Sequence, residues 1–239
     1  MTSPQVAFPV RLTGELDPDV GRWRWLFKWL LAIPHFIILL FLWIGFVAST
    51  VVAGFAILFT GRYPRGIFDF NVGVLRWSWR VGFYSYSALG TDRYPPFSLA
   101  DDPAYPARLE VEYPERLSRG LVLVKWWLLA IPHYLIVAIF TGGAWSAWSD
   151  GGDGWLYATG GGLIGLLVLF AGLSLLFTSR YPRSLYDFVL GLNRWVFRVV
   201  AYAGLMTDTY PPFRLDSGGT EPPAAGTAPA GSTSPVPTV

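Results

Sequence analysis

The 239-residue chain contains no cysteine, only two histidines and few charged residues. The absence of cysteine excludes disulfides, thiolate metal sites and cysteine nucleophiles. Charged residues make up 14% of the chain, against about 25% in an average soluble domain. A net charge of only +2 argues against a nucleic-acid partner. Because 53% of the residues are hydrophobic, the composition is typical of a membrane protein.

Several motifs occur twice in the same order, which indicates an internal duplication. The sequence therefore predicts unit one over residues 1–100 and unit two over residues 101–215. The tail 216–239 is built almost wholly from Gly, Pro, Ala, Ser and Thr, and we expect it to be disordered because it has too little apolar surface to bury. The repeated motifs are a Lys-Trp pair at Lys28 and Lys125, LLAIPH at Leu30 and Leu128, RYPR at Arg62 and Arg180, and TDxYPPF at Thr91 and Thr207.

Each unit carries an apolar run too long for one membrane crossing, since a straight helix over Trp23–Thr60 would measure roughly 57 Å against a hydrocarbon core of about 30 Å. The spacing between matching motifs grows from 98 residues at LLAIPH to 118 at RYPR, so about 20 residues are inserted around Gly142–Gly154. Insertions are tolerated in loops, and we therefore expect a turn there and near Trp43–Ser49. Each unit is then a transmembrane helical hairpin, with helices at about 23–44 and 46–61 in unit one and about 119–141 and 156–178 in unit two.

The positive charges predict the orientation of these hairpins. Lysine and arginine are absent from both expected hairpin tips and flank the apolar runs instead. By the positive-inside rule, both termini are cytoplasmic in a multi-pass protein. Short alternating stretches around Val6–Leu12 and Leu109–Tyr113 predict β segments on the same cytoplasmic side, paired as a small ribbon. The predicted fold class is an all-α integral membrane protein built as a tandem repeat.

After each RYPR loop the sequence predicts an amphipathic helix, at about 66–90 and about 184–206. Polar residues recur in steps of three or four, which places them on one helical face. Arginine at the centre of a bilayer is costly, so we expect both helices to lie in the cytoplasmic interface. The two polar faces comprise Asp69, Gly73, Arg76, Arg80 and Tyr84, and Asp187, Gly191, Arg194, Arg198 and Tyr202.

The arginines of the loops and helices have two interpretations. They form either a solvated face that anchors the helix, or basic pockets for anionic headgroups or phosphate, which arginine can bind in a bidentate manner. Asp69 and Asp187 are candidate ion-pair partners of the RYPR arginines. The headgroup or phosphate candidates are Arg62, Arg65, Arg76, Arg80, Arg180, Arg183, Arg194 and Arg198.

The LLAIPH motif places a proline and a histidine inside each first helix. Pro34 and Pro132 are expected to kink the helix and to free a backbone carbonyl, to which His35 or His133 could donate. The alternative is a functional pair of histidines, as a proton relay or as ligands of haem or a metal. No cofactor or metal site is predicted, because no further ligand motif accompanies the histidines.

The pattern KWLLAIPH … FTGRYPRGIFDF … RWSWRV … TDRYPPFSL resembles bacterial membrane proteins of the domain of unknown function 4389 family, in two tandem copies. The resemblance covers nearly all of residues 6–215. Unit two departs from it in its Gly-Trp-rich insertion and in Thr209, where unit one has Arg93. The resemblance implies a location in the bacterial cytoplasmic (inner) membrane and implies no activity.

These observations favour a non-catalytic membrane protein, as a scaffold, an accessory subunit or a lipid-organising module. Its expected partners are the bilayer, anionic lipid headgroups, and other membrane proteins or further copies of itself. One alternative is a small transporter or channel subunit that uses His35 and His133. Another is an enzyme acting on lipid headgroups, although no nucleophile or base is evident, and HExxH and GxSxG do not occur.

Overall fold

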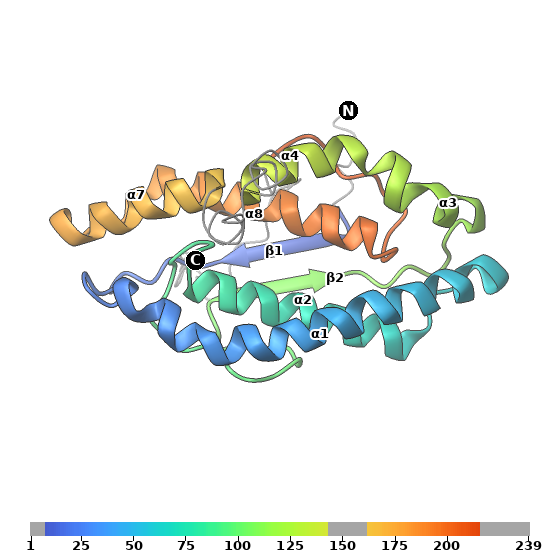
Figure 1. The fold of residues 1–239 in the computed structure, drawn as a ribbon, viewed down its shortest axis with the longest axis horizontal. Helices are drawn as coiled ribbons and strands as arrows, with labels where there is room; N and C mark the ends of the chain where they lie inside the picture. Colours follow the sequence, from blue (N-terminus) through green and yellow to red (C-terminus); the bar gives the residue numbers. More distant parts are fainter. Residues whose placement is uncertain (1–7, 143–161, 216–239) are drawn as a thin grey trace, which may run out of the picture.

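The computed structural model describes residues 8–142 and 162–215. Over these residues the chain is mainly helical, with a two-stranded sheet between the long helices of the two units (Figure 1). The predicted disorder of 216–239 and the predicted turn in the insertion lie outside the described residues. The elements are β1 (Val10–Gly14), α1 (Trp25–Thr60), α2 (Arg65–Tyr84), β2 (Ala107–Val111), α3 (Arg119–Val124), the π-helix η1 (Lys125–Leu129), α4 (Ile131–Thr141), α7 (Leu163–Thr178) and α8 (Arg183–Ala203).

The two strands join the two units. β1 pairs antiparallel with β2 in a register that places Leu12 opposite Leu109 and Arg11 opposite Glu110. The leucines are buried and the charged pair is exposed, as expected for strands whose side chains alternate between core and solvent. The predicted pairing of these segments is confirmed.

α1 is one continuous helix of 36 residues, so the prediction of two helices at about 23–44 and 46–61 is wrong. The expected turn at Trp43–Ser49 is helical, and its side chains bind α2. Ser49 Oγ donates a hydrogen bond to Asn71 Oδ1 at 2.7 Å. No residue in this stretch forces the helix to end, and its contacts with α2 stabilise α1 as one continuous helix.

Unit two contains the same helical path, interrupted by the insertion. α3, η1 and α4 correspond to the first half of α1, and α7 corresponds to the second half. After α4 the chain turns at Gly142 (φ 89°), and α7 begins after Gly162. The two glycines lie together, since a Cβ placed on Gly162 would be 2.3 Å from the Gly142 nitrogen. The insertion thus leaves and rejoins the path at one place, so the difference in length between the repeats requires no turn in unit one.

The π-helix absorbs a single extra residue. Lys28 precedes His35 by seven residues, whereas Lys125 precedes His133 by eight, because unit two has two tryptophans where unit one has one. η1 begins at this lysine and holds one additional residue in its wider turn. As a result, lysine and histidine face the protein interior in both units.

The helices predicted at 66–90 and 184–206 are present as α2 and α8, and each begins directly after the proline of its RYPR loop. The helix arginines, however, do not point outward toward headgroups as predicted. α2 packs between α1 and β2, and α8 packs against β1, α4 and α7. Apart from the exposed Asp69 and Asp187, the polar faces lie against the sheet and the segments that follow each helix, where carbonyl groups accept the arginine hydrogen bonds described below.

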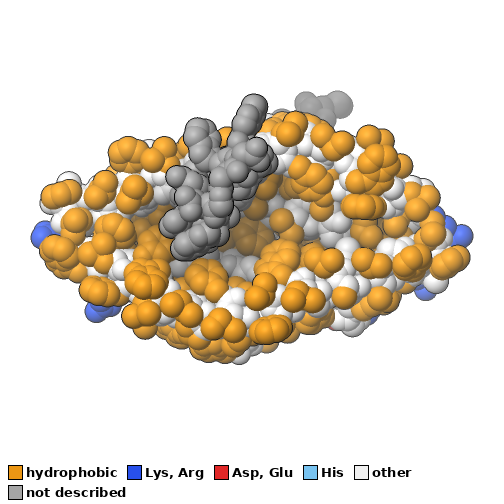
Figure 2. Space-filling model, viewed as in Figure 1, with side chains coloured by type: hydrophobic (Ala, Val, Ile, Leu, Met, Phe, Trp, Pro, Cys, Tyr) orange, Lys and Arg blue, Asp and Glu red, His pale blue; other side chains and the backbone are white. Residues whose placement is uncertain are grey.

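One broad face of the molecule is covered with hydrophobic side chains over α1, α4 and α7 (Figure 2). Only 17% of the most apolar window of α1 is buried. By length and composition α1 could cross a membrane, and the pair Arg119–Leu129 and Ile131–Thr141, bent by 45°, could do so only if counted as one span. α7 is a shorter apolar helix.

Candidate functional site

Each histidine lies at the centre of an aromatic cluster within its own unit. In unit one, Trp77 Nε1 donates a hydrogen bond to His35 Nδ1 at 3.0 Å, and the Phe97 ring stacks on the imidazole with centroids 4.0 Å apart. Because Nδ1 accepts, the neutral ring carries its proton on Nε2, which is buried and has no partner among the described residues. The equivalent contacts in unit two, at 3.1 and 4.5 Å, join His133 to Trp195 and Phe213.

The histidines do not serve the prolines, so that prediction is wrong. Pro34 removes the helical donor of the Leu30 carbonyl, and neither nitrogen of His35 donates to a carbonyl among the described residues. Tyr94 Oη donates to the neighbouring Leu31 carbonyl at 3.1 Å. Pro132 is the second residue of α4, where no intrahelical donor is required. The motif that recurs in the two units therefore reflects aromatic packing around the imidazole.

About two helical turns before each histidine, the first helix of the unit carries a buried lysine. Lys28 Nζ is 2.8 Å from Asp92 Oδ1 and donates to the Thr91 carbonyl at 2.7 Å. The Tyr84 ring lies 5.0 Å from the ammonium, within cation–π range. The equivalent group in unit two is Lys125, Asp208, Thr207 and Tyr202.

The aspartate of each pair also holds the entry to the first helix. Asp92 Oδ2 accepts a hydrogen bond from the Gly21 N–H at 2.7 Å, and Asp208 Oδ2 accepts one from Ser118 N–H at 2.6 Å. A carboxylate bound by a lysine and a backbone N–H is well satisfied for a buried charge. The TD dipeptide of each TDxYPPF motif is therefore an anchor for the first helix.

The remainder of each motif forms a strap, defined here as Thr91–Leu99 and Thr207–Leu215. Gly73 in α2 lies beneath the unit-one strap, since a Cβ there would be 2.8 Å from Leu99 Cβ. Two turns later in α2, the Arg80 guanidinium donates to the Ser98 carbonyl. Gly191 and Arg198 have the same relation to Leu215 and Arg214. Arg80 and Arg198 are 2% exposed, so these two headgroup candidates bind the protein's own backbone.

The other pair of helix arginines crosses between units. Arg76 Nε donates to the Leu109 carbonyl in β2, and Arg194 Nε donates to the Leu12 carbonyl in β1, both at 3.0 Å. Each unit thus holds the central residue of the other unit's strand. This reciprocal bonding explains why Arg76 and Arg194 stand on the polar faces of their helices.

The RYPR tyrosines cross between units as well. Tyr63 Oη donates to the Gly204 carbonyl at 3.2 Å, and Tyr181 Oη donates to the Ala88 carbonyl at 2.9 Å. Burial raises the pKa of Tyr63 to about 12, so its phenol stays protonated and remains a donor at neutral pH. Burial also raises the pKa of Tyr181.

The loop arginines remain exposed. Arg65 stacks its guanidinium over the Tyr113 ring at 3.8 Å. The predicted pairing of Asp69 and Asp187 with these arginines does not occur, because the ion pairs among the described residues are those of Asp92 and Asp208 alone. The headgroup hypothesis stays a prediction for the exposed set Arg62, Arg65, Arg180 and Arg183.

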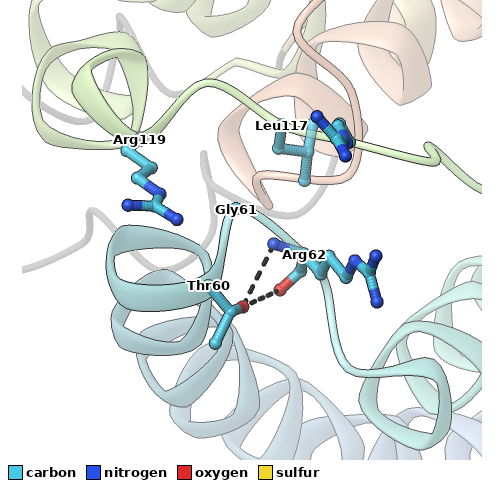
Figure 3. Close-up of a pocket in the computed structure, with 6 residues that line it drawn as sticks. Thr60, Gly61, Arg62, Leu117 and Arg119 are labelled. Atoms are coloured by element: carbon cyan, nitrogen blue, oxygen red, sulfur yellow. Dashed lines mark hydrogen bonds between the residues drawn. The ribbon is translucent and has the colours of Figure 1, made fainter.

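A pocket of about 450 Å³ lies where α1 ends and α3 begins (Figure 3). Its lining includes Arg62, Arg116 and Arg119, with Thr60 Oγ1 accepting the Arg62 N–H at 3.2 Å. The described chain gives these three guanidinium groups neither a hydrogen bond nor an ion pair. Three unpaired cations around one cavity form a candidate anion site.

The other end of the molecule repeats part of this arrangement. Thr178 Oγ1 accepts the Arg180 N–H at 3.3 Å, as Thr60 does for Arg62. Arg22, which matches Arg119 in the repeat, donates from Nε to Ser179 Oγ. Figure 2 shows lysine and arginine only at these two ends of the apolar face.

Sequence reasoning missed the buried lysine–aspartate pairs and the role of Arg116 and Arg119. The signal for the pairs was present, because Lys28 and Asp92 stand within motifs that recur in unit two as Lys125 and Asp208. The pocket carried no comparable signal, since Arg116 has no counterpart in the repeated motifs.

The profile of a family described as "Domain of unknown function (DUF4389)" matches residues 22–98 and 155–214, together more than half of the chain. The two matched segments agree with the two tandem units. No curated protein and no solved structure matches the chain.

Proposed function

The chain belongs to the DUF4389 family, and we propose that it is a non-catalytic membrane protein that gathers anionic lipids at its two arginine-rich ends. The observation that carries this proposal is the combination of an exposed apolar face with exposed loop arginines at both of its ends, Arg62 at one and Arg180 at the other. A soluble monomer rarely exposes a continuous apolar surface of this kind.

The use of the polar residues supports a non-catalytic role. The interior lysines and aspartates pair with each other, and the helix arginines bind backbone carbonyls. The histidine Nδ1 atoms accept tryptophan hydrogen bonds. These groups hold helices, straps and strands together, which leaves the loop arginines as the groups available to a ligand.

The pocket suits a phosphate group. Arginine binds phosphate through parallel N–H donors, and Arg62, Arg116 and Arg119, from two chain segments, are among the residues that line the pocket. Each cationic side chain near an anionic leaflet contributes about 1 kcal/mol of attraction. In this proposal the arginine ends and both termini face the cytoplasm at a bacterial inner membrane, and the partners are anionic lipids.

Native mass spectrometry of protein purified with equal phosphatidylglycerol and phosphatidylcholine tests the proposal. We expect phosphatidylglycerol to be retained preferentially, and the triple variant R62Q/R116Q/R119Q to lose most of that preference. The control R11Q/R93Q/R108Q removes the same charge elsewhere and should keep it. Equal loss in both variants, or equal retention of the two lipids by the wild type, contradicts the proposal. Displacement of lipid by millimolar inorganic phosphate would assign the site to free phosphate instead.

The transport alternative rests on one observation, the buried Nε2 atoms of His35 and His133, for which the described residues provide no hydrogen bond of normal geometry. Each histidine is enclosed by aromatic residues of its own unit, which does not favour a shared path. On our proposal, H35A/H133A folds and keeps its lipid preference. Loss of a measured proteoliposome flux in that variant, with folding intact, would favour transport.

A further inference from the structure

We infer that the protein lies flat on a single leaflet, with α1 parallel to the membrane plane, and does not cross the bilayer. The inference rests on the membrane association proposed above and adds its geometry. The surface involved is the apolar face of α1, α4 and α7, and the occupant is the lipid leaflet.

The side chains of α1 divide into an apolar exposed set and a set that faces the protein. Every exposed side chain from Leu26 to Phe59 is apolar, whereas Lys28, His35 and Ser49 face the protein. The apolar surface therefore runs along the full helix and has no polar boundary in the middle. A helix that ended its crossing within this stretch would leave bare apolar side chains in water.

The length of α1 does not fit a crossing. A helix of 36 residues is roughly 54 Å long. Placing all of it within a hydrocarbon core of about 30 Å would require a tilt of about 56°, beyond the roughly 40° seen in membrane proteins. A helix lying in the plane meets no such limit.

Charged groups lie beside the middle of α1. α2 runs alongside, with Trp43 Nε1 donating to Ser78 Oγ at 3.1 Å, so Arg76 is near the midpoint of α1. Arg76 binds β2 next to the exposed Glu110. A crossing would carry these groups to the bilayer centre, where one arginine costs about 2.5–3.5 kcal/mol. In the flat orientation the sheet stays at the aqueous side.

The charges at the ends of α1 agree with one leaflet. Arg22 and Arg24 precede the helix, and Arg62 and Arg65 follow it. In the flat orientation all four reach headgroups of the same leaflet. A second copy of the chain is a poorer occupant, because antiparallel stacking of two such faces would bring cationic ends together, and Figure 2 shows no acidic side chain on this face among the described residues.

Three phenylalanines of α1 provide a matched depth test. Phe27, Phe41 and Phe55 are 63%, 66% and 62% exposed. They are spaced by 14 residues, or about 21 Å along the helix and within roughly 40° of the same side from one to the next. The chain has no native cysteine, so a single Phe→Cys change gives a unique site for a nitroxide label.

The full-length labelled variants are reconstituted in phosphatidylglycerol–phosphatidylcholine vesicles, and label depth is measured by oxygen and nickel-chelate accessibility. We expect all three labels in the acyl region at similar depths. A profile with Phe41 near the bilayer centre and Phe27 and Phe55 near opposite surfaces overturns the flat orientation and leaves the lipid proposal standing. Labels that stay fully accessible to the nickel chelate, or a lipid-free dimer that shields them, overturn both.

Discussion

At the residue scale, the repeated motifs are explained by contacts inside the protein. The lysine, histidine and strap residues of each unit form one continuous cluster, from Lys28 and Asp92 to His35 and Phe97. A buried ion pair is costly to create, and removal of one partner leaves an uncompensated charge. The cluster therefore fixes the position of each strap against its first helix.

Replacement of Lys28 by methionine should lower the free energy of unfolding by about 3–5 kcal/mol, because Asp92 would remain buried without its partner. Lys125→Met should cost less, since the Asp208 side chain is 24% exposed against 8% for Asp92. Denaturant unfolding in mild detergent, followed by tryptophan fluorescence, measures both. K28M/D92N should recover part of the loss, and a K28M effect below about 0.5 kcal/mol would contradict the account.

At the element scale, the π-helix and the paired glycines show how one architecture accommodates unequal repeats. η1 takes up the extra tryptophan of unit two, and Gly142 and Gly162 bring the ends of the insertion together. η1 places its two tryptophans on the exposed side, the two glycines are buried, and both devices leave the buried side chains of the two units in register. The buried stripe, rather than the length of the helix, is what the two units share.

Deletion of Trp127 should convert η1 into an α-helical turn and leave Lys125 and His133 in place, changing the unfolding free energy by less than about 1 kcal/mol. Deletion of the similarly exposed Trp29 is the matched control. It rotates Lys28 by about 100° relative to His35 and should separate the lysine from its aspartate. Thermal unfolding by circular dichroism distinguishes the two, and equal losses would contradict this interpretation of η1.

At the scale of the whole molecule, the two units form one body. The strands pair, and Arg76, Arg194, Tyr63 and Tyr181 each donate to a carbonyl of the other unit. The two arginine hydrogen bonds are charged and contribute about 1.5–3 kcal/mol each. Each unit therefore depends on the other unit for part of its hydrogen bonding.

Units expressed together as separate chains, 1–100 and 101–215, should therefore copurify when one carries an affinity tag. R76L/R194L removes both arginine bonds to the strands and should reduce recovery of the untagged unit at least tenfold, from a loss of about 3 kcal/mol or more. Arg116→Leu, which removes an arginine without a bond between units, is the control. Unchanged recovery in the double variant would show that the strands alone hold the units together.

The duplication, the strand pairing and the amphipathic helices were predictable, because each leaves a local periodic pattern. The straight path of α1 was not, because helix length was judged against the bilayer and an insertion was assumed to mark a turn. The inward direction of Arg76 and Arg80 depends on carbonyl groups far along the chain, which no local pattern reveals. The sequence did not separate the exposed loop arginines from the inward-facing helix arginines, and Arg116 joins the loop arginines only through the fold.

The continuity of α1 underlies both the apolar face and the flat orientation, and one distance tests it. Spin labels at Phe27 and Phe59, which are 63% and 73% exposed, would be separated by 32 residues of helix, or roughly 48 Å. Pulsed electron–electron double resonance on the reconstituted double-cysteine variant should give a single distribution near that distance. A distribution centred below about 20 Å would mean that the chain turns back within this segment, as antiparallel helices packed about 10 Å apart do, and would contradict the account.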